Sequence, residues 1–461
     1  MASRTERDSM GELQVPEYAL YQAQTQRAVQ NFQLSGNAMP EAFIRALLQI
    51  KSAAASTNNQ LGLLSTEISA AITQAAQQQL NQLDMRQYPV DVFQTGSGTS
   101  SNMNVNEVLA TLASRSLQQP VSANDHVNLG QSSNDTIPTA IQVSSALAIK
   151  QQLLPAITSL QHVLSEKIIQ VGHVVKTGRT HLMDAMPVTF GQVLQGWQAQ
   201  LQACEQQLQF QFAQLQALPQ GGTAVGTGIN ADPAFSALFC QHIAQITGVS
   251  FQPAANFFAA MGSQDTAVAT SGALKTLAVC LLKISNDLRW MNSGPLAGLA
   301  EITLPALQPG SSIMPGKVNP VIPEAVAMIC TQVCGNDTAI TLAAQSGNFE
   351  LNVMLPLIAN NLLNSISLLA KATAALAQQA IAGFSINETR IKQTLARNPI
   401  LVTALNPLIG YANAAAIAKQ AYAEQRPIID VALEHTNYSR EELTQLLDPA
   451  RLCQGGNIKQ P

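Results

Sequence analysis

The sequence predicts an all-α fold that is built around a central bundle of five long helices. Apolar residues recur at steps of three and four along five segments, which is the period of a helix with one buried face. Polar, glycine-rich connections separate these segments. Helices of such length bury their apolar faces only against one another or against other subunits. The five segments are residues 138–171, 190–218, 267–291, 325–343 and 355–381.

The first of the five predicted helices illustrates the pattern. Its apolar stripe runs through Ile149, Leu153 and Ile157 and continues for several turns. At about 1.5 Å per residue, residues 138–171 span roughly 50 Å as a helix. Pro155 lies inside this segment and cannot donate a backbone hydrogen bond, so we expect a kink there.

We expect three domains, because roughly 150 residues per domain is usual. The chain has 461 residues, and the helical segments become shorter after residue 387. The predicted boundaries give an N-terminal domain of residues 1–131, a central helical-bundle domain of residues 132–388 and a small C-terminal helical domain of residues 389–461. In the last of these, Ser439 and Glu442 have the spacing of a capping box, which predicts that a helix begins there.

The low charge of the chain bears on its partners. Lys and Arg number 24 and Asp and Glu number 28, so the formal net charge is −4 and no positive excess can neutralise nucleic-acid phosphates. Charged residues make up only 11% of the chain, and hydrophobic residues make up 46%. A surface with so little charge tends to associate, so we expect much of it to be buried in an oligomer.

Other features predict a cytoplasmic protein without a membrane anchor or a metal. No window reaches about 18 uninterrupted apolar residues, so no membrane-spanning helix is expected. The N-terminal segment is polar and lacks the apolar stretch of a signal peptide. The six cysteines form no CxxC pair, and no His or acidic side chain lies at metal-ligand spacing beside Cys330 and Cys334. We therefore expect reduced thiols.

The most distinctive connection is residues 310–320, GSSIMPGKVNP. Glycine permits tight backbone conformations and proline fixes others, so such a segment can bring backbone N–H groups close to a small molecule. Lys317 and Asn319 would attract and orient a carboxylate. A serine could act as a base where positive charge and amide dipoles draw off its proton. An ordinary surface loop is the alternative that composition leaves open.

This connection resembles the signature of the fumarase/aspartase superfamily. Four other segments resemble the shared segments of that superfamily in the same order, namely TGSGTSSNMNVNE, NDHVNLGQSSNDTIPT, GRTHLMDAMPVTFGQ and GGTAVGTGIN. The resemblance covers almost the whole chain, from residue 8 to residue 447. FQTGSGTSSNMN, GNFELNV and LVTALNPLIGY look most like class II fumarases, whereas NPVIPEAV looks somewhat like an aspartase.

The resemblance implies a homotetramer in which the central helices of the subunits form a common multi-helix core. Each active site of such a tetramer collects loops from three subunits and needs no metal or organic cofactor. The implied reaction is reversible anti addition of water to fumarate through a carbanion, which gives (S)-malate. Aspartate ammonia-lyase activity is the alternative, and a structural protein that keeps the fold without activity is a further hypothesis.

The resemblance also implies roles for individual residues. Ser311 matches the serine that removes or returns the proton on the carbon next to a carboxylate. His181 matches the residue that handles the oxygen, through a bound water, and Glu324 matches the carboxylate that orients and charges this histidine. The candidates for holding the two substrate carboxylates are Ser97, Thr99, Ser132, Ser133, Asn134, Thr180, Lys317 and Asn319.

Elementary chemistry agrees with these implied roles. A dicarboxylate needs two anion pockets, and hydroxyl and amide groups at the start of a helix can supply one of them. Lys317 and Asn319 can supply the other. Removing a proton next to a carboxylate produces an aci-carboxylate dianion. Donors aimed at its oxygens therefore bind the transition state more tightly than the substrate.

Several departures from the class II fumarase pattern remove charge, and two of them concern single positions. Ser122 stands where the first histidine of His-Pro-Asn-Asp-His is usual, which leaves Asn124 and Asp125 as candidates for an accessory anion site. Leu296 stands where an arginine is usual. We expect these changes to alter interfaces between helices or subunits without affecting the reacting groups.

Overall fold

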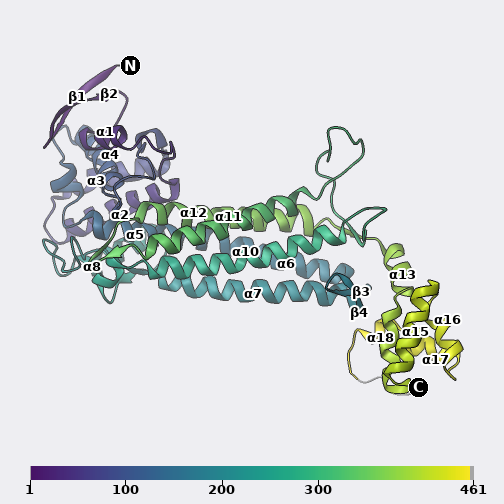
Figure 1. The fold of residues 1–461 in the computed structure, drawn as a ribbon. Helices are drawn as coiled ribbons and strands as arrows, with labels where there is room; N and C mark the ends of the chain where they lie inside the picture. The colour runs from purple at the N-terminus through teal and green to yellow at the C-terminus, as the bar shows by residue number, and fades with distance from the viewer. Residues whose placement is uncertain (1, 457–461) are drawn as a thin grey trace. The chain divides into compact units, whose positions relative to one another are not determined.

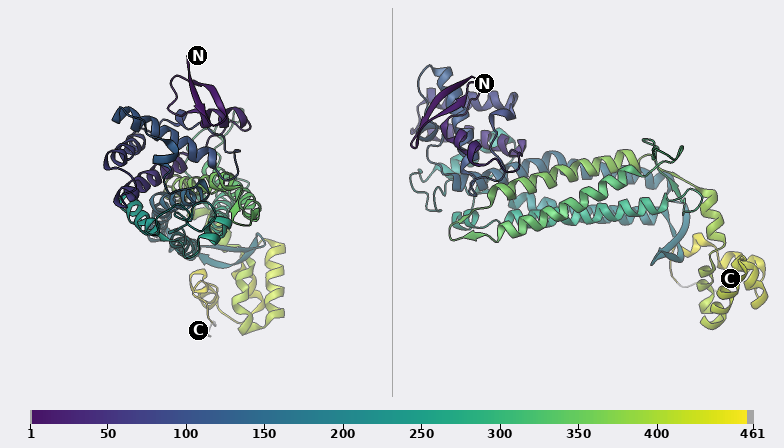
Figure 2. Two further views of the ribbon diagram at one scale, coloured as in Figure 1. Left: turned by 90° about the vertical axis from the view of Figure 1, so that its left-hand side faces the viewer. Right: turned by 45° about the horizontal axis from the view of Figure 1, so that its top comes forward.

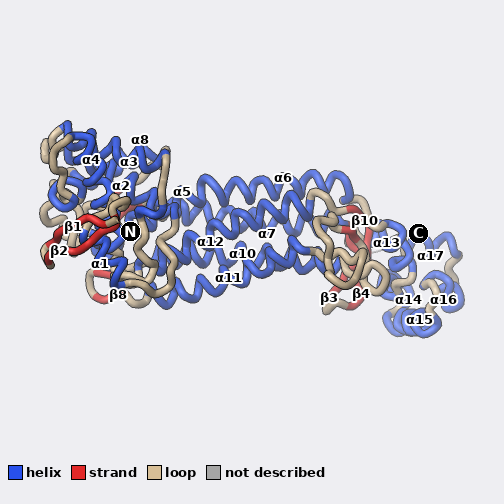
Figure 3. The backbone as a smooth tube through the Cα atoms, turned by 90° about the horizontal axis from the view of Figure 1, so that it is seen from above, coloured by secondary structure: helices blue, strands red, loops and turns tan. Residues whose placement is uncertain are grey.

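The computed structural model describes residues 2–456 and confirms that the chain is predominantly helical. Figure 1 labels the helices and strands, and Figure 3 shows that the strands are short pieces between helices. The strands of the described part form five two-stranded sheets. The chain divides into two compact units, which we call unit 1 (within residues 1–156, 204–278 and 329–371) and unit 2 (within residues 157–203, 279–328 and 372–461).

Unit 1 holds most of the N-terminal helices. Its elements are β1 (Ser3–Asp8), β2 (Gly11–Pro16), α1 (Ala23–Asn31), α2 (Glu41–Gln60), α3 (Thr66–Asn81), η1 (Met85–Gln87), α4 (Thr99–Leu117), η2 (Ala123–Val127), α5 (Ser133–Ala148), η3 (Ile149–Leu153), β5 (Ala217–Leu218), α8 (Phe235–Thr247), β6 (Gln252–Pro253), α9 (Phe257–Gly262), β8 (Gly347–Asn348) and β9 (Leu351–Asn352).

Unit 2 holds the remaining strands and the C-terminal helices. Its elements are β3 (Val175–Thr180), β4 (Met183–Thr189), β7 (Ile302–Thr303), η4 (Leu376–Ile381), β10 (Ser385–Ile386), α13 (Glu388–Ala396), η5 (Pro399–Leu405), α14 (Asn406–Ile409), α15 (Tyr411–Glu424), α16 (Ile428–His435), α17 (Arg440–Leu446) and α18 (Pro449–Leu452). The helices that contribute to both units are α6 (Leu154–Val171), α7 (Phe190–Gln214), α10 (Asp265–Met291), α11 (Val321–Ala344) and α12 (Leu355–Ala375).

All five predicted long helices are present, and Figure 2 shows them running side by side. The segment predicted at 138–171 consists of α5, η3 and α6 in succession, and the segment predicted at 355–381 consists of α12 and η4. Polar side chains also join neighbouring helices. The pairs are Gln198 with the Gln161 carbonyl (α7 to α6, 3.1 Å), Lys283 over the Trp197 ring (α10 to α7, 5.9 Å to the centroid), Lys275 with Asp337 (α10 to α11, 2.5 Å) and Asn336 with Ser365 (α11 to α12, 3.0 Å).

The irregularity expected at Pro155 is a π-helical turn, Ile149–Leu153, which lies directly before it. A proline cannot donate the next hydrogen bond of an α-helix, and a π turn is a common way to accommodate the interruption. Helix α5 begins five residues before its predicted start, at Ser133, because Ser132 and Asp135 form a capping box. The stretch SSND contains the capping-box residues, but it precedes the first of the regularly spaced apolar residues from which the helix start was predicted.

Among residues 2–456, one helix, α10, is long and apolar enough to span a membrane by length and composition alone. Its most apolar 18-residue window has a mean hydropathy of 1.5, and 56% of that window is buried. A core helix of a water-soluble bundle has the same properties. All six cysteines are free thiols, as predicted.

Most of the polar connection between the predicted helices at residues 138–171 and 190–218 is a β-hairpin. Strands β3 and β4 pair antiparallel, with Thr180 opposite Met183. His181 and Leu182 form the two-residue turn, and both have positive φ, at 55° and 60°. Such turns usually carry Asn-Gly or Asp-Gly, so the sequence His-Leu gave no hairpin signal.

The C-terminal helices of unit 2 enclose a small core of their own. Leu405, Ile417, Val431 and Leu443 are fully buried within it. The capping box predicted at residue 439 is confirmed: Ser439 Oγ accepts from the Glu442 amide at 3.2 Å, and the Glu442 carboxylate accepts from the Ser439 amide at 2.7 Å.

Glu107 of α4 caps the start of α1 and offers a test of unit 1 packing. Its buried carboxylate accepts hydrogen bonds from the backbone N–H groups of Gln22, Gln24 and Thr25, at 2.9–3.1 Å, and from the Thr25 hydroxyl. Because Glu107→Ala leaves buried donors without partners, we expect it to reduce the free energy of unfolding by about 1–3 kcal/mol. Chemical denaturation measures this loss.

The matched control is Glu41→Ala. Glu41 forms an exposed ion pair with Arg45 one turn along α2, with the Glu41 side chain 56% exposed. An exposed pair of this kind contributes only about 0.3–0.5 kcal/mol. Equal losses for the two variants would contradict the capping role of Glu107.

Candidate active site

In unit 1 the first turns of α4 and α5 lie against each other. Gly98, which precedes α4, has a φ of +73°, and a Cβ atom on it would lie 2.9 Å from the Ile137 side chain of α5. This close approach places the candidate binding residues at the two helix starts in one region. Ser97 is buried, and its hydroxyl lies 2.9 Å from the hydroxyl of Thr99, the first residue of α4.

The segment Ser132–Asn134 forms the start of α5. Ser132 Oγ accepts from the Asn134 amide at 3.2 Å and caps the helix. Ser133 Oγ accepts from Asn102 Nδ2 of α4 at 3.0 Å. Asn134 Nδ2 donates to the Ala224 carbonyl at 2.8 Å. Backbone N–H groups at a helix start favour a bound anion, so the geometry suits one carboxylate of a substrate.

Asp135 ties the glycine-rich segment 221–230 to the same helix start. Its fully buried carboxylate accepts from the backbone N–H groups of Gly221 at 3.0 Å and Thr223 at 2.9 Å, besides that of Ser132. Burial raises the pKa of Asp135 to about 6, although the three N–H donors act in the opposite direction. Unit 1 therefore brings the segments TGSGT, SSND and GGTAVG together.

The segment GNFELNV also packs against this region. The Leu355 amide donates to the Gly96 carbonyl at 3.0 Å. A Cβ atom on Gly96 would lie only 1.8 Å from the Val353 carbonyl oxygen, so no larger residue fits there without a backbone shift. This contact explains why a glycine stands between Thr95 and Ser97.

In unit 2 the loop of residues 310–320 closes on itself. The Gly310 amide donates to the Lys317 carbonyl at 2.8 Å, and Asn319 Nδ2 donates to the Gly310 carbonyl at 2.7 Å. Ser311 Oγ accepts from the amides of Ile313 and Met314, at 3.2 and 3.1 Å. Two N–H donors aimed at this oxygen stabilise negative charge on it, which suits a serine that acts as a base.

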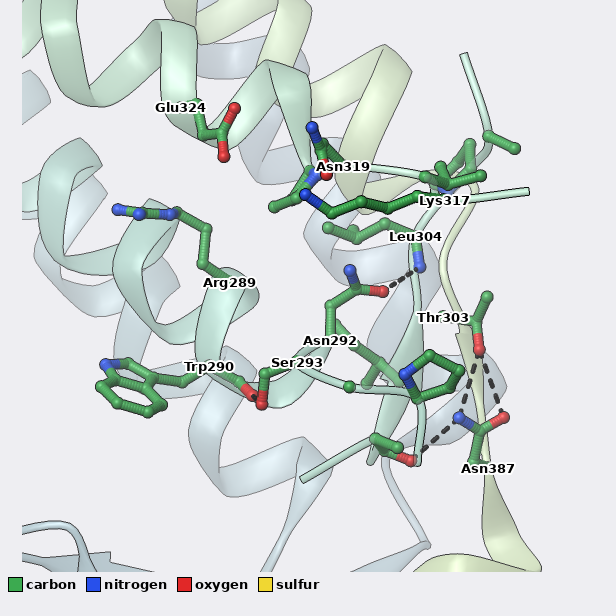
Figure 4. Close-up of a pocket in the computed structure, with 18 of the residues that line it drawn as sticks. Arg289, Trp290, Asn292, Ser293, Thr303, Leu304, Lys317, Asn319, Glu324 and Asn387 are labelled. Carbon is green, nitrogen blue, oxygen red and sulfur yellow. Dashed lines mark hydrogen bonds between the residues drawn. The ribbon is translucent and has the colours of Figure 1, made fainter. Parts of the chain in front are cut away.

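A cavity of about 710 Å³ lies beside this loop. Figure 4 shows Lys317, Asn319 and Glu324 among the residues that line it, together with Arg289 and Asn292 of the α10 end. Its charged lining residues are two cations, Lys317 and Arg289, and one carboxylate, Glu324, so the cavity favours an anion. Ser311 and His181 do not line it.

Thr180 and His181 lie at the exposed tip of the β3–β4 hairpin. Within the described residues of the single chain, the His181 side chain makes no hydrogen bond, and neither does the Glu324 carboxylate. The chain therefore does not itself bring together the predicted histidine and its predicted carboxylate partner.

A buried ion cluster fixes the base of that hairpin. The Glu301 carboxylate lies 3.1 Å from Lys176 Nζ and 2.8 Å from the Arg179 guanidinium, and Glu301 and Lys176 are almost fully buried. The Glu301 neighbours Ala300 and Ile302 line the cavity. Glu301 thus connects the hairpin that carries His181 to the cavity wall. Burial lowers the pKa of Lys176, and the Glu301 charge opposes this effect.

The candidate accessory site is exposed. Asn124 and Asp125 lie on η2, outside the buried part of unit 1. Ser122 caps this turn: its hydroxyl donates to the Asp125 carboxylate at 2.8 Å and accepts from the Asp125 amide at 3.0 Å. The His126 ring accepts from the Ser122 amide at 3.0 Å, so His126 has a structural hydrogen-bond role here.

Three charged groups near these segments were not identified from the sequence. Arg289 lies in a helix that was interpreted only as part of the bundle, and Glu301 lies in an apolar stretch. Lys51 lies within the apolar face of α2. An isolated charged residue in an otherwise apolar helical segment was the one available indication for Lys51.

Comparison with known proteins identifies the family to which the chain belongs. Residues 11–335 match the family described as lyase, and residues 401–454 match the one described as fumarase C C-terminus. Two proteins named as fumarate hydratases of class II, from Pseudomonas aeruginosa and Xylella fastidiosa, are 62% and 56% identical; each alignment covers 98% of this chain, and 99% and 96% of theirs.

Solved structures agree. The class II fumarase from Schistosoma mansoni has a TM-score of 0.95 at 37% identity, covering 98% of this chain and 99% of that one. A fumarate lyase:delta crystallin from Brucella melitensis bound to cobalt has a TM-score of 0.93 at 42% identity, covering 98% and 100%.

The bundle and its loops are those of a helical lyase of the fumarase/aspartase superfamily. Within that superfamily the chain belongs to the class II fumarate hydratase family. These relatives give no support to the ammonia-lyase alternative.

Proposed function

We propose that the protein catalyses the reversible hydration of fumarate to (S)-malate. The observation that carries the proposal is the loop of residues 310–320. There the Ser311 oxygen accepts two backbone N–H groups, while Lys317 and Asn319 line a cavity with excess positive charge. Removing a proton from the carbon next to a carboxylate requires a base, and it requires a positively charged pocket that binds that carboxylate.

In the malate-to-fumarate direction, the reaction begins at the methylene carbon of malate. Ser311 removes a proton from the methylene carbon, and the electron pair moves into the adjacent carboxylate as an aci-carboxylate dianion. Lys317 and Asn319 stabilise this dianion. The double bond then forms as the hydroxyl group leaves from the neighbouring carbon. His181 delivers a proton to the leaving oxygen through a water molecule, and a second water is the product. The Glu324 carboxylate orients the imidazole in this proposal.

The second substrate carboxylate binds at the start of α5 in this proposal. Ser132, Ser133 and Asn134 supply hydroxyl, amide and helix N-terminal donors there, with Thr99 and Ser97 next to them. Thr180 contributes from the tip of the hairpin. Asn124 and Asp125 form a weaker accessory site, because the Asp125 carboxylate already accepts a hydrogen bond from the Ser122 hydroxyl.

We further propose that the protein is a homotetramer whose active sites are shared between subunits. His181 is exposed and without a hydrogen-bond partner in the described part of one chain, so its carboxylate partner would come from another subunit. Apolar side chains of the long helices are also exposed, among them Val279 (56%), Met328 (69%) and Leu342 (56%). Burying them between subunits removes apolar surface from water.

Two broader proposals complete this assignment. The six free thiols support a cytoplasmic location, where thiols stay reduced. We also propose three domains with boundaries near residues 131 and 388, and the separate core of the C-terminal helices supports the second of these boundaries.

A parallel assay tests the proposed reaction. The ultraviolet absorbance of fumarate is followed while the purified protein is incubated with malate and, separately, with aspartate. We expect absorbance to rise with malate alone. A rise with aspartate alone would establish the ammonia-lyase, and no rise with either substrate would favour a structural protein that keeps the fold.

A further inference from the structure

Lys51 is a fully buried lysine in the middle of α2. Its Nζ atom donates to Asn128 Oδ1 at 2.9 Å and to Gln131 Oε1 at 3.0 Å. Both acceptors are neutral amides, and no carboxylate lies within ion-pair distance of Lys51 in the described part of the chain. A buried cation without a direct counter-ion is costly, so its presence calls for an explanation beyond packing.

A chain of amide groups links Lys51 to the start of α5. Asn128 Oδ1, which accepts from Lys51, also accepts from Asn102 Nδ2 at 3.2 Å and from Asn106 Nδ2 at 3.1 Å. The same Asn102 amide donates to Ser133 Oγ at 3.0 Å. The lysine is therefore two side chains away from the hydroxyl of Ser133, one of the residues proposed to hold a substrate carboxylate.

The backbone before α5 is held by the same residues. Asn128 Nδ2 donates to the Gln131 carbonyl at 3.1 Å, which closes residues 128–131 into a turn directly before Ser132. On the far side of Ser132, Asp135 accepts from the Ser132 amide at 2.9 Å. Lys51 and Asp135 thus act from the two sides of Ser132–Asn134, and their charges influence each other.

We propose that Lys51 is a positioning residue that supplies positive potential beneath Ser132–Asn134 and holds these donors toward one substrate carboxylate. The donors of this segment are all neutral and Asp135 beside them is acidic, so Lys51 is the cation that offsets Asp135 and lets the pocket favour a dianion over a neutral molecule. This inference rests on the proposed function, because it assigns that segment to substrate binding.

Charge balance decides against a purely structural role. Burial lowers the pKa of Lys51 to about 7, and the Asp135 charge works against this effect. A methionine or leucine would fill the same space without that desolvation cost. A pKa of about 7 leaves Lys51 only partly charged at neutral pH, so a dianion bound at the start of α5 would favour its charged form.

The test compares Lys51→Met, which keeps the length and the apolar stem, with Lys51→Arg, which keeps the charge. The readouts are kcat and KM for fumarate and the inhibition constant of succinate, a dicarboxylate that cannot react. We expect Lys51→Met to raise KM and the succinate constant about tenfold or more while kcat falls much less. Lys51→Arg should restore part of this binding. The control is Lys150→Met, because Lys150 is exposed and donates only to the Gly248 carbonyl.

A second variant keeps the proposal testable if Lys51→Met does not fold. Asn128→Asp places a carboxylate of the same shape next to Lys51 and cancels its charge locally, and it should also weaken succinate binding. Unchanged KM and succinate constants in a folded Lys51→Met or Asn128→Asp protein would overturn the inference. Wild-type protein that fails to hydrate fumarate would instead refute the proposed function.

Discussion

Ser311→Ala is expected to lower kcat for malate dehydration by about 10²–10⁴-fold, the usual contribution of a general base. The hydroxyl oxygen that receives the Ile313 and Met314 N–H groups disappears, and with it the proposed base. KM should change little, because Lys317 and Asn319 still bind the carboxylate. Steady-state kinetics on the purified variant, together with its oligomeric state by light scattering, measure the effect.

The adjacent hydroxyl provides the control for this prediction. Ser312 is exposed and lies next to Ser311 in the same loop. Ser312→Ala should keep kcat within about threefold of wild type, since single surface substitutions rarely disturb a fold. Similar losses for both variants would indicate a disturbed loop, and unchanged turnover in Ser311→Ala would remove the serine from its proposed role.

Glu301→Gln is expected to destabilise the protein by about 3–5 kcal/mol, as is usual when one partner of a buried ion cluster is removed. Lys176 and the Arg179 guanidinium would then face each other without a carboxylate between them. Because the same cluster fixes the hairpin that carries Thr180 and His181, kcat should fall as well. Thermal unfolding and kinetics at a temperature where the variant is folded separate the two effects.

An exposed ion pair gives the comparison for Glu301. Glu388 pairs with Lys392 on the surface of α13, with both side chains more than half exposed. Glu388→Gln should cost less than about 1 kcal/mol and leave kcat unchanged. If Glu301→Gln behaved like Glu388→Gln, the cluster would not hold the hairpin.

The long helices were predictable because apolar periodicity reports directly on burial along a helix. The hairpin at residues 175–189 was not, because its turn is made by His181 and Leu182, which carry no turn preference. Their positive φ values persist because the paired strands on either side impose them. The earlier start of α5 could have been predicted, since Ser132 and Asp135 have capping-box spacing.

Some residues of the candidate site were likewise indicated by the sequence, and others were not. The loop that carries Ser311, Lys317 and Asn319 could be singled out because its motif is specific, and Lys317 and Asn319 line one cavity. The roles of Glu301 and Lys51 could not be predicted, because their partners are distant in the sequence. Glu301 pairs with Lys176, 125 positions away, and Lys51 donates to Asn128, 77 positions away. Such pairings depend on the completed fold and leave no local pattern.

The central claim is that His181 and Ser311 act on one substrate from different subunits. Ser311→Ala and His181→Asn proteins, each nearly inactive, are mixed, unfolded together, refolded and assayed with malate. If subunits assort at random and each site takes the two residues from different chains, about a quarter of the sites regain both residues, and activity returns to about a quarter of wild type. A mixture that stays as inactive as its two components, although mixed tetramers form, would contradict the account.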